Sequence, residues 1–332
     1  MENIIVTGGL GFIGLNLLSF LTSKKKYFVH NIDNFSLGHT YFDDFLTKDQ
    51  KLLIKNYKID INQSDNVKKI LEDNNVNKIF HLAAESHVDR SISGPIQFYN
   101  SNVMGTLNLV ETCRNFIIEK KISDFKFIHV STDEVFGDLT KDDEPFNEQT
   151  PYNPSSPYSA SKAASDFIIK SWFRTYKFPG IITNCSNNFG PCQNLEKFIP
   201  MSITKLLKKE KMGIYGNGQN IRDWLFVQDH VEALYLIMQN GNVGETYCIG
   251  GNTELSNVDL FKEIYSIINN ELNLNVLPYK DSFSFISDRL GHDFRYSINT
   301  KKIENKFGIK FKTSLKKSLN KTVEFYIENS LS

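Results

Sequence analysis

A glycine-rich turn near the N-terminus constrains the fold of this chain more than any other feature. It reads Thr7-Gly8-Gly9-Leu10-Gly11-Phe12-Ile13-Gly14. The turn joins the apolar, β-branched run 3–7, expected to be a buried strand, to residues 12–21, whose spacing predicts a helix. Glycine permits a tight turn and lets backbone N–H groups approach a pyrophosphate at a helix N-terminus. In this setting the pattern favours a dinucleotide site over a plain strand–turn–helix.

Short β-rich runs alternate with helical stretches through the N-terminal half. Further strands are expected at 28–32, 53–59, 78–82, 125–130 and 180–184, and long helices at 98–118 and 157–176. This alternation predicts an α/β fold with a Rossmann-type doubly wound parallel sheet covered on both faces. After about residue 185 turn signals multiply, which indicates a smaller α+β portion. We expect residues 1–185, with a return at 224–249, to bind the dinucleotide, and 186–332 to form a discontinuous second domain.

Composition excludes several classes of function. Lys and Arg number 38 and Asp and Glu number 38, so the formal net charge is zero and a nucleic-acid partner is not expected. The cysteines at 113, 185, 192 and 248 form no C-x-x-C pair, which predicts reduced thiols in a cytoplasmic protein and no metal site. The apolar stretch 4–21 is preceded only by Glu2 and followed by three lysines, the wrong order for a signal peptide. No run of 18 apolar residues predicts a membrane span.

An acid at the end of the second expected strand bears on the choice of cofactor. Asp33 lies 25 positions after Gly8. A carboxylate there can bond the ribose hydroxyls and repel a 2′-phosphate, which favours NAD over NADP. The alternative is an ordinary turn aspartate in Asp33-Asn34.

Two further groups could carry acid–base chemistry. Tyr158 and Lys162 lie four positions apart, on one face of the helix 157–176, where an ammonium favours the phenolate form. Such a tyrosine can take a proton from an alcohol as hydride leaves. Thr132-Asp133-Glu134 follows the fifth strand, and neighbouring carboxyls can have their pKa values pushed apart. The alternatives are a surface Tyr–Lys pair and a capped turn.

Together these motifs resemble the nucleotide-sugar 4,6-dehydratases of the extended short-chain dehydrogenase/reductase superfamily. The similar segments are spread over most of the chain: HLAAESHVDRSI (81–92), STDEVFG (131–137), PYSASK (157–162), NNFGP (187–191), GNGQNIRDWLFVQDH (216–230) and DRLGHDFRY (288–296). The Asp133–Glu134 pair separates this family from epimerases of the same fold. Gly213 and Leu290 stand where the family has proline near the nucleotide pocket, so the resemblance leaves thymidine or uridine open.

The resemblance implies a role for each matching residue. The NAD site would comprise Gly8, Gly11, Phe12, Ile13, Gly14, Asp33, Asn34, Asp60, Ile61, Leu82, Ala83, Ala84, Ser101, Tyr158, Lys162 and Asn188. The nucleotide-sugar site would comprise Ser86, Thr132, Asn187, Lys197, Phe198, Tyr215, Arg222, Asn257, Arg289, His292 and Tyr296. Taken alone, His292 could be a turn histidine and Arg222-Asp223 a local ion pair.

The implied reaction is an internal redox cycle on dTDP-glucose or UDP-glucose. Tyr158 would remove the 4-hydroxyl proton, with Thr132 near that hydroxyl and Lys162 as its partner. Glu134 would remove the C5 proton, Asp133 would protonate the departing 6-hydroxyl, and the product would be a 4-keto-6-deoxy sugar for a rhamnose-type pathway. A nucleotide-sugar 4-epimerase and a non-catalytic NAD-sensing protein are the alternatives. The resemblance also implies a homodimer through the two long helices.

Overall fold

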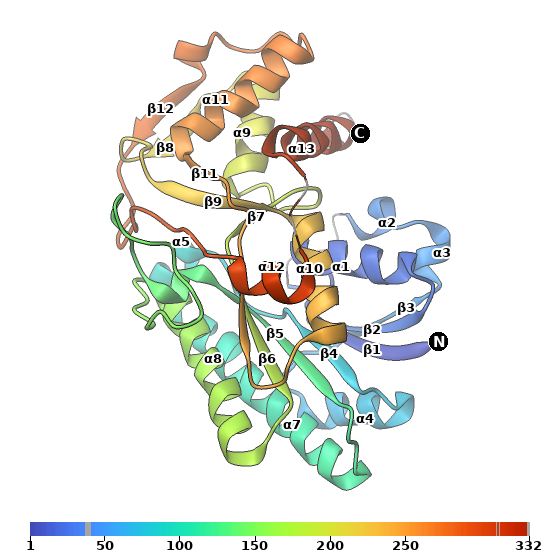
Figure 1. The fold of residues 1–332 in the computed structure, drawn as a ribbon. Coiled ribbons are helices and arrows are strands. Elements are labelled where there is room, and N and C mark those ends of the chain that lie inside the picture. The colour runs from blue at the N-terminus through green and yellow to red at the C-terminus, as the bar shows by residue number, and fades with distance from the viewer. Residues whose placement is uncertain (37–40, 310, 312, 331–332) are drawn as a thin grey trace.

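A seven-stranded parallel sheet forms the centre of the larger lobe (Figure 1). The computed structural model describes residues 1–36, 41–309, 311 and 313–330. The strands are β1 (Glu2–Thr7), β2 (Tyr27–Asp33), β3 (Ile54–Lys58), β4 (Lys78–His81), β5 (Lys126–Thr132), β6 (Gly180–Cys185) and β10 (Thr246–Ile249). Their order is β10-β6-β5-β4-β1-β2-β3, and every pairing is parallel. This order confirms the predicted Rossmann-type doubly wound sheet.

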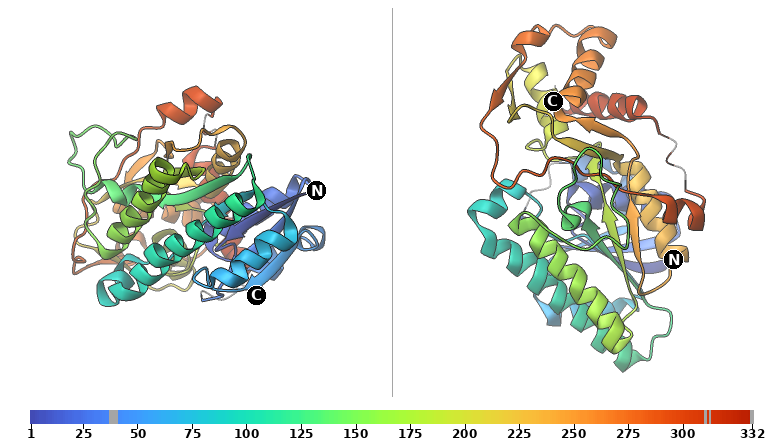
Figure 2. Two further views of the ribbon diagram at one scale, coloured as in Figure 1. Left: turned by 90° about the horizontal axis from the view of Figure 1, so that it is seen from below. Right: turned by 60° about the vertical axis from the view of Figure 1, so that its left-hand side comes forward.

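Helices cover both faces of this sheet (Figures 1 and 2). One face carries α1 (Phe12–Ser23), α10 (Val227–Asn240) and α12 (Lys301–Phe307); the other carries α4 (Ser64–Asn74), α7 (Gly105–Lys120) and α8 (Pro157–Tyr176). Strand β1 shows how one strand contributes apolar side chains to the helices on both faces of the sheet. Ile4 and Val6 pack toward α1, whereas Ile5 packs toward α4 and α7. Because side chains alternate along a strand, a strand covered on both faces is a continuous apolar run.

The helix predicted at 98–118 is longer than expected and is interrupted. It begins as α6 (Pro95–Phe98), continues through a π-helical turn at Tyr99–Met104, and becomes α7. A π turn adds one residue to the helical repeat, a feature often found at functional sites. Shorter helices α2 (Phe42–Phe45), α3 (Lys48–Lys51) and α5 (Val88–Ser93) lie in the loops, and a 3₁₀ turn, Asp133–Phe136, follows β5.

The smaller lobe is built around two short sheets. The first has the order β11-β9-β7, from β7 (Asn187–Phe189), β9 (Ile221–Phe226) and β11 (Glu254–Ser256); the second pairs β8 (Met212–Tyr215) with β12 (Phe283–Ile286). Helices α9 (Phe198–Leu207), α11 (Asn257–Ser266) and α13 (Leu315–Ser330) pack against them through residues such as Ile203, Phe261 and Leu319. A π-helical turn, Ile267–Glu271, extends α11, and a 3₁₀ turn forms at Tyr279–Asp281.

The chain passes between the lobes several times. The segment 224–249 begins in β9 of the smaller lobe, then contributes α10 and β10 to the larger one. Later, α12 returns and buries Ile303 in the core beside α1 and α10. The four cysteines are buried and not disulfide-bonded.

Within the described part of the chain, no helix has both the length and the apolar character needed to cross a membrane.

Candidate active site

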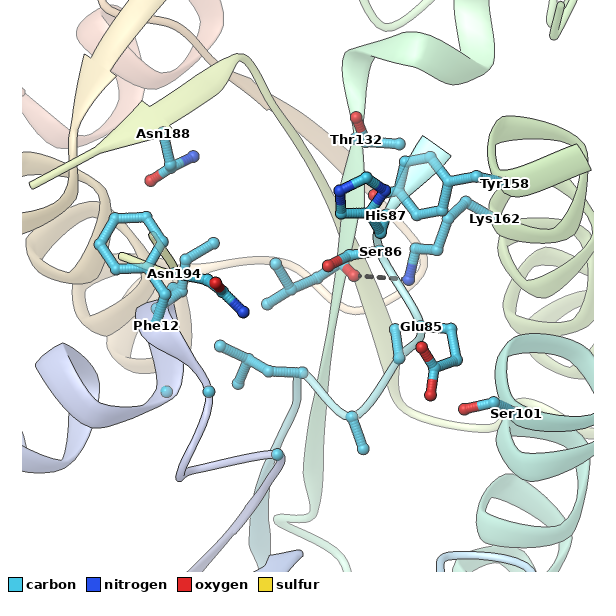
Figure 3. A pocket seen from close by; sticks show the side chains of 18 of the residues that line it. Phe12, Glu85, Ser86, His87, Ser101, Thr132, Tyr158, Lys162, Asn188 and Asn194 are labelled. Carbon is cyan, nitrogen blue, oxygen red and sulfur yellow. Dashed lines mark hydrogen bonds between the residues drawn. The ribbon is translucent and has the colours of Figure 1, made fainter. Parts of the chain in front are cut away.

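A cavity opens at the carboxyl ends of the parallel strands, the place where open α/β sheets bind ligands (Figure 3). Its walls come from the loops after β1, β2, β3, β4, β5 and β6 and from α8. The structure brings every residue of the predicted cofactor set to this cavity: Gly8, Gly11, Phe12, Ile13, Gly14, Asp33, Asn34, Asp60, Ile61, Leu82, Ala83, Ala84, Ser101, Tyr158, Lys162 and Asn188.

The three glycines of the turn have different tasks. Gly8 has a φ of +72°, and a Cβ there would lie 2.7 Å from the Ala83 nitrogen. Gly14 lets α1 pack against the turn, since its Cβ would lie 2.2 Å from the Gly8 oxygen. Gly11 is the N-cap of α1 and has no side chain to cap it. The unpaired N–H groups of the first helical turn therefore lie at the cavity, which fits a pyrophosphate.

The strand-end acids form the far end of the cavity. Asp33 accepts hydrogen bonds from the Leu10 nitrogen at 3.0 Å and the Phe35 nitrogen at 2.8 Å. These bonds fix the carboxylate between the glycine turn and the end of β2. Asn34 donates to Asp60, at the neighbouring end of β3, at 3.4 Å. Carboxylate and amide groups at adjacent strand ends suit the hydroxyls of a ribose.

Thr132, Asp133 and Glu134 form the turn that follows β5. The Thr132 hydroxyl accepts from the Glu134 nitrogen and donates to Asp133 Oδ1, both at 3.3 Å. Asp133 is 1% exposed, and its Oδ2 has no partner within the described residues. Burial, with the nearby carboxyls of Glu134 and Asp223, raises the pKa of Asp133 well above its usual value. The raised pKa favours the protonated form of Asp133, which is the form that can donate a proton.

Glu134 has a different electrostatic environment, although it is adjacent. Burial raises its pKa, but Arg289, Arg222 and Lys197 oppose that rise. The three cations therefore limit the rise for Glu134, whereas the pKa of Asp133 is raised well above its usual value. Two neighbouring carboxyls with separated pKa values are the arrangement expected of an acid and a base.

Tyr158 and Lys162 point from α8 into the same cavity as Thr132 (Figure 3). The helix begins at a capping box made by Ser156 and Ser159, with Pro157 in its first turn. Lys162 is 4% exposed and donates to the Val130 carbonyl at 2.8 Å. Burial lowers the pKa of Lys162.

The pKa of Tyr158 differs in direction from the expectation. Burial and the carboxyl of Glu134 raise it well above its usual value, opposed by the Thr132 hydroxyl. The Lys162 ammonium is directed at the backbone of β5, so it does not offset the burial of the phenol. Tyr158 is thus a protonated phenol in this structure, and additional positive charge in the cavity is needed to make it a base.

The predicted nucleotide-sugar residues fall into two groups. Ser86, Thr132, Asn187 and Lys197 line the cavity. Phe198, Tyr215, Arg222, Asn257, Arg289, His292 and Tyr296 lie outside its lining, in the smaller lobe and the segment that precedes α12.

Several of the outer residues nevertheless act on the turn formed by Thr132, Asp133 and Glu134. The Arg222 guanidinium stacks 4.3 Å from the centre of the Tyr296 ring, and both Arg222 and Arg289 act on the pKa of Glu134. The Tyr215 and His292 rings meet edge to face. Asn257 instead begins α11 and donates its N–H to the Asn220 carbonyl.

Contacts between the lobes bring three residues to the cavity that sequence reasoning missed, Glu196, Arg90 and His87, beside the predicted Ser86 and Lys197. Glu196 forms an ion pair with Arg90 at 2.5 Å and lies 3.6 Å from His87 Nε2. Lys197 donates to the Ser86 carbonyl at 3.2 Å. All of these residues line the cavity and join the loop after β4 to the loop before α9. His87 and Arg90 lie in the segment that follows β4, and this position beyond a strand end was the available signal.

Fold and site together define a member of the extended short-chain dehydrogenase/reductase superfamily. The sheet order, the glycine turn and the paired Tyr158 and Lys162 are the basis for this assignment. The family model described as GDP-mannose 4,6 dehydratase matches residues 5–322, and the chain belongs to this family.

Individual relatives match over the whole chain. The dTDP-glucose 4,6-dehydratase of Haemophilus influenzae is 43% identical over 340 residues, covering 100% of both proteins. The crystal structure of dTDP-glucose 4,6-dehydratase from Bacillus anthracis in complex with NAD has a TM-score of 0.87 at 37% identity, covering 100% of this chain and 98% of that one. UDP-glucose 4-epimerase from Thermotoga maritima has a TM-score of 0.85 at 26% identity, with full coverage of both. Overall fold alone therefore does not separate dehydratase from epimerase.

Proposed function

We propose that this protein is an NAD-dependent hydro-lyase, a nucleotide-diphosphate-glucose 4,6-dehydratase that acts on dTDP-glucose, with UDP-glucose as the alternative. The observation that carries this proposal is the pair of carboxyls at the catalytic turn. Asp133 is buried with a raised pKa, while Glu134 is subject to the charges of three cations and lies near Tyr158. The full-length similarity to dTDP-glucose 4,6-dehydratases supports the same reading.

The cavity fits NAD at both ends. The first turn of α1 offers N–H groups to the pyrophosphate, and Asp33 offers a fixed carboxylate to the ribose. Bound NAD⁺ would supply the hydride acceptor and a positive charge at the nicotinamide. We assign the larger lobe to this cofactor and the smaller lobe, with Lys197, Arg222 and Arg289, to the diphosphate and nucleotide.

In the proposed cycle, Tyr158 takes the proton of the 4-hydroxyl as hydride leaves C4. The new 4-ketone acidifies the C5 proton, which Glu134 removes. Asp133 then gives its proton to the 6-hydroxyl, so that water departs and a C5–C6 double bond forms. Return of the hydride to C6 and of a proton to C5 yields the 4-keto-6-deoxy sugar. The raised pKa of the buried Asp133 and the cations that act on Glu134 match these two proton transfers.

A turnover assay tests the proposal directly. Purified protein should convert dTDP-glucose, and we would compare UDP-glucose and other nucleotide-diphosphate glucoses at equal concentration. Mass spectrometry should show loss of one water per sugar. A 4-epimerase would leave the mass unchanged, and an NAD-sensing protein would give no product. Tyr158→Phe should suppress even the first reduction of bound NAD⁺.

Exposed apolar side chains support assembly into a homodimer. Ile96, Tyr99, Met104, Phe167 and Tyr176 lie on α6, its π-helical extension and α8, and each is more than 40% exposed. Helices α7 and α8 run side by side on the outside of the larger lobe (Figure 2). Two copies of this face would form a four-helix interface and cover this apolar surface. Light scattering at micromolar concentration should show a dimer, and a monomer alone would reject it.

We place the enzyme in the cytoplasm, in a rhamnose-type deoxysugar pathway. Four buried, unpaired thiols suit a reducing compartment. Deletion of the gene in its host should abolish the deoxysugar derived from the 4-keto product, and an unchanged sugar composition would reject this placement.

A further inference from the structure

A buried carboxylate lies on α8 behind Tyr158 and Lys162. Asp166 follows Lys162 by one turn of α8, and its side chain is 0% exposed. Its Oδ2 accepts hydrogen bonds from Tyr152 at 2.8 Å, Ser131 at 3.0 Å and Asn184 at 3.2 Å. Its Oδ1 lies 3.1 Å from His129 Nε2. A carboxylate with this many donors is stabilised in its ionised form.

The partners of Asp166 are themselves joined to the catalytic residues. Ser131 follows Val130, whose carbonyl accepts the hydrogen bond from Lys162. Asn184 also donates to the carbonyl of Thr132 at 3.1 Å. One buried side chain therefore connects α8, β5 and β6 where they meet below the cavity, and it reaches the start of the catalytic turn through a single amide.

The titratable groups around Lys162 are neutral at pH 7 with the exception of Asp166, which is its counter-charge. Tyr158 and Asp166 face it from α8, His81 from β4, His129 from β5 and Cys185 from β6. Burial lowers the pKa of His129 to about 4 and that of His81 well below its usual value, so both rings are neutral at pH 7. Burial raises the pKa of the Cys185 thiol to about 12, so it is also neutral.

Asp166 itself remains ionised. Burial alone would raise its pKa, but the nearby His129 ring, the hydrogen bond from Tyr152 and the charge of Lys162 bring it below the usual value. Conversely, burial lowers the pKa of Lys162 and Asp166 opposes that change. The two groups lie one turn apart on α8 and are both buried, so their opposite charges act on each other although their side chains form no direct ion pair.

We propose that Asp166 is a positioning residue of the active site, the buried counter-ion that keeps Lys162 an ammonium while its hydrogen bonds fix the end of β5. This inference rests on the proposed dehydratase function for its kinetic consequence only. The pairing of charges is a property of the protein without substrate.

The first test is a double-variant cycle in thermal unfolding of the NAD-free protein. Asp166→Asn keeps the size of the side chain but leaves Lys162 as an uncompensated buried cation, so the melting temperature should fall. Lys162→Met placed on top of Asp166→Asn should raise it again, because the unpaired charge is gone. If the melting-temperature losses of the two single variants simply add in the double variant, the proposal is overturned, and this result does not depend on the reaction that the protein catalyses.

The second test is the pH profile for reduction of bound NAD⁺ in a single turnover. Without the carboxylate, Lys162 loses its proton at a lower pH, so the basic limb should move down by about one pH unit or more. That corresponds to about a tenfold lower rate at a pH above the limb. Tyr152→Phe, which removes a donor to Asp166 but no charge, should leave the limb in place.

The two tests distinguish the possible failures. An unmoved basic limb in Asp166→Asn, or an equal movement in Tyr152→Phe, would reduce Asp166 to a structural role and overturn the inference. A wild-type protein that forms no 4-keto-6-deoxy sugar would instead refute the proposed function, and the unfolding cycle would still decide the charge pairing.

Discussion

The packing of α1 against the glycine turn makes Gly14→Ala a demanding test of how the cofactor site is built. An added Cβ would lie 2.2 Å from the Gly8 oxygen and 2.6 Å from the Gly9 Cα. Both are backbone atoms, so no side-chain rotation can relieve the contact. The helix must move away from the turn, and the N–H groups at its start then no longer meet a pyrophosphate.

The size of the effect follows from two opposing contributions. Alanine is a better helix former than glycine by about 1 kcal/mol. Overpacking a rigid site costs about 1–3 kcal/mol, and backbone obstruction places this site at or beyond the upper end. A net loss of about 2 kcal/mol remains. With about 2.1 cal/mol/K of unfolding entropy per residue, a chain of 332 residues should lose about 3 °C in melting temperature.

Gly11→Ala is the matched control. Its Cβ would lie 3.3 Å from the Gly8 oxygen, and its φ of −73° is accessible to alanine. Replacing a glycine N-cap by alanine costs up to about 1 kcal/mol, so the melting temperature should fall by less than about 2 °C. Differential scanning calorimetry and the NAD content of purified protein are the measurements. Wild-type stability and NAD content in Gly14→Ala would refute the packing argument.

Results for four further variants are expected. Asp133→Asn should keep single-turnover reduction of NAD⁺ but lower formation of the 4-keto-6-deoxy product about 10²–10⁴-fold, and full dehydration would reject Asp133 as the general acid. Glu134→Gln should slow exchange of the C5 proton with deuterium from the solvent. Asp33→Ala should weaken discrimination between NAD and NADP, measured by the nucleotide released on denaturation. Unchanged binding would refute the contact between Asp33 and the ribose. The hydrogen bonds from Arg295 lower the pKa of Glu254, so Glu254→Gln should lower the melting temperature at pH 7. The difference in melting temperature from wild type should shrink as the pH falls through that lowered pKa. A difference that does not depend on pH would contradict the pairing of Glu254 with Arg295.

The features predicted well from sequence are those set by local pattern. Residues 3–7 were expected as the first strand and lie within β1, and Pro157–Tyr176 matches α8 at both ends. The Ser156 cap and Pro157 are strong start signals, and alternating burial shapes β1. Because the ends of parallel strands converge, the predicted cofactor residues also meet in one cavity.

Features that depend on contacts distant in sequence were not predictable. The π-helical turn Tyr99–Met104 follows a helical apolar pattern, and periodicity does not reveal one added residue. The ion pair between Arg90 and Glu196 joins residues 106 positions apart, and only the approach of the two lobes creates it. The raised pKa of Tyr158 likewise depends on burial and on the direction of the Lys162 ammonium, which spacing on a helix does not define.

The repeated passage of the chain between the lobes constrains synthesis on the ribosome. The core beneath α1 combines residues from Ile4 to Ile309. The edge strand β10 and the covering helix α12 therefore emerge long after β1 to β6 have been made. Until then the nascent sheet exposes the β6 edge and part of an apolar face, which are sites for premature association with other chains. Neither lobe corresponds to one continuous stretch of sequence, so truncation at a point before α12 would remove part of both, and folding in the cell must wait for almost the whole polypeptide.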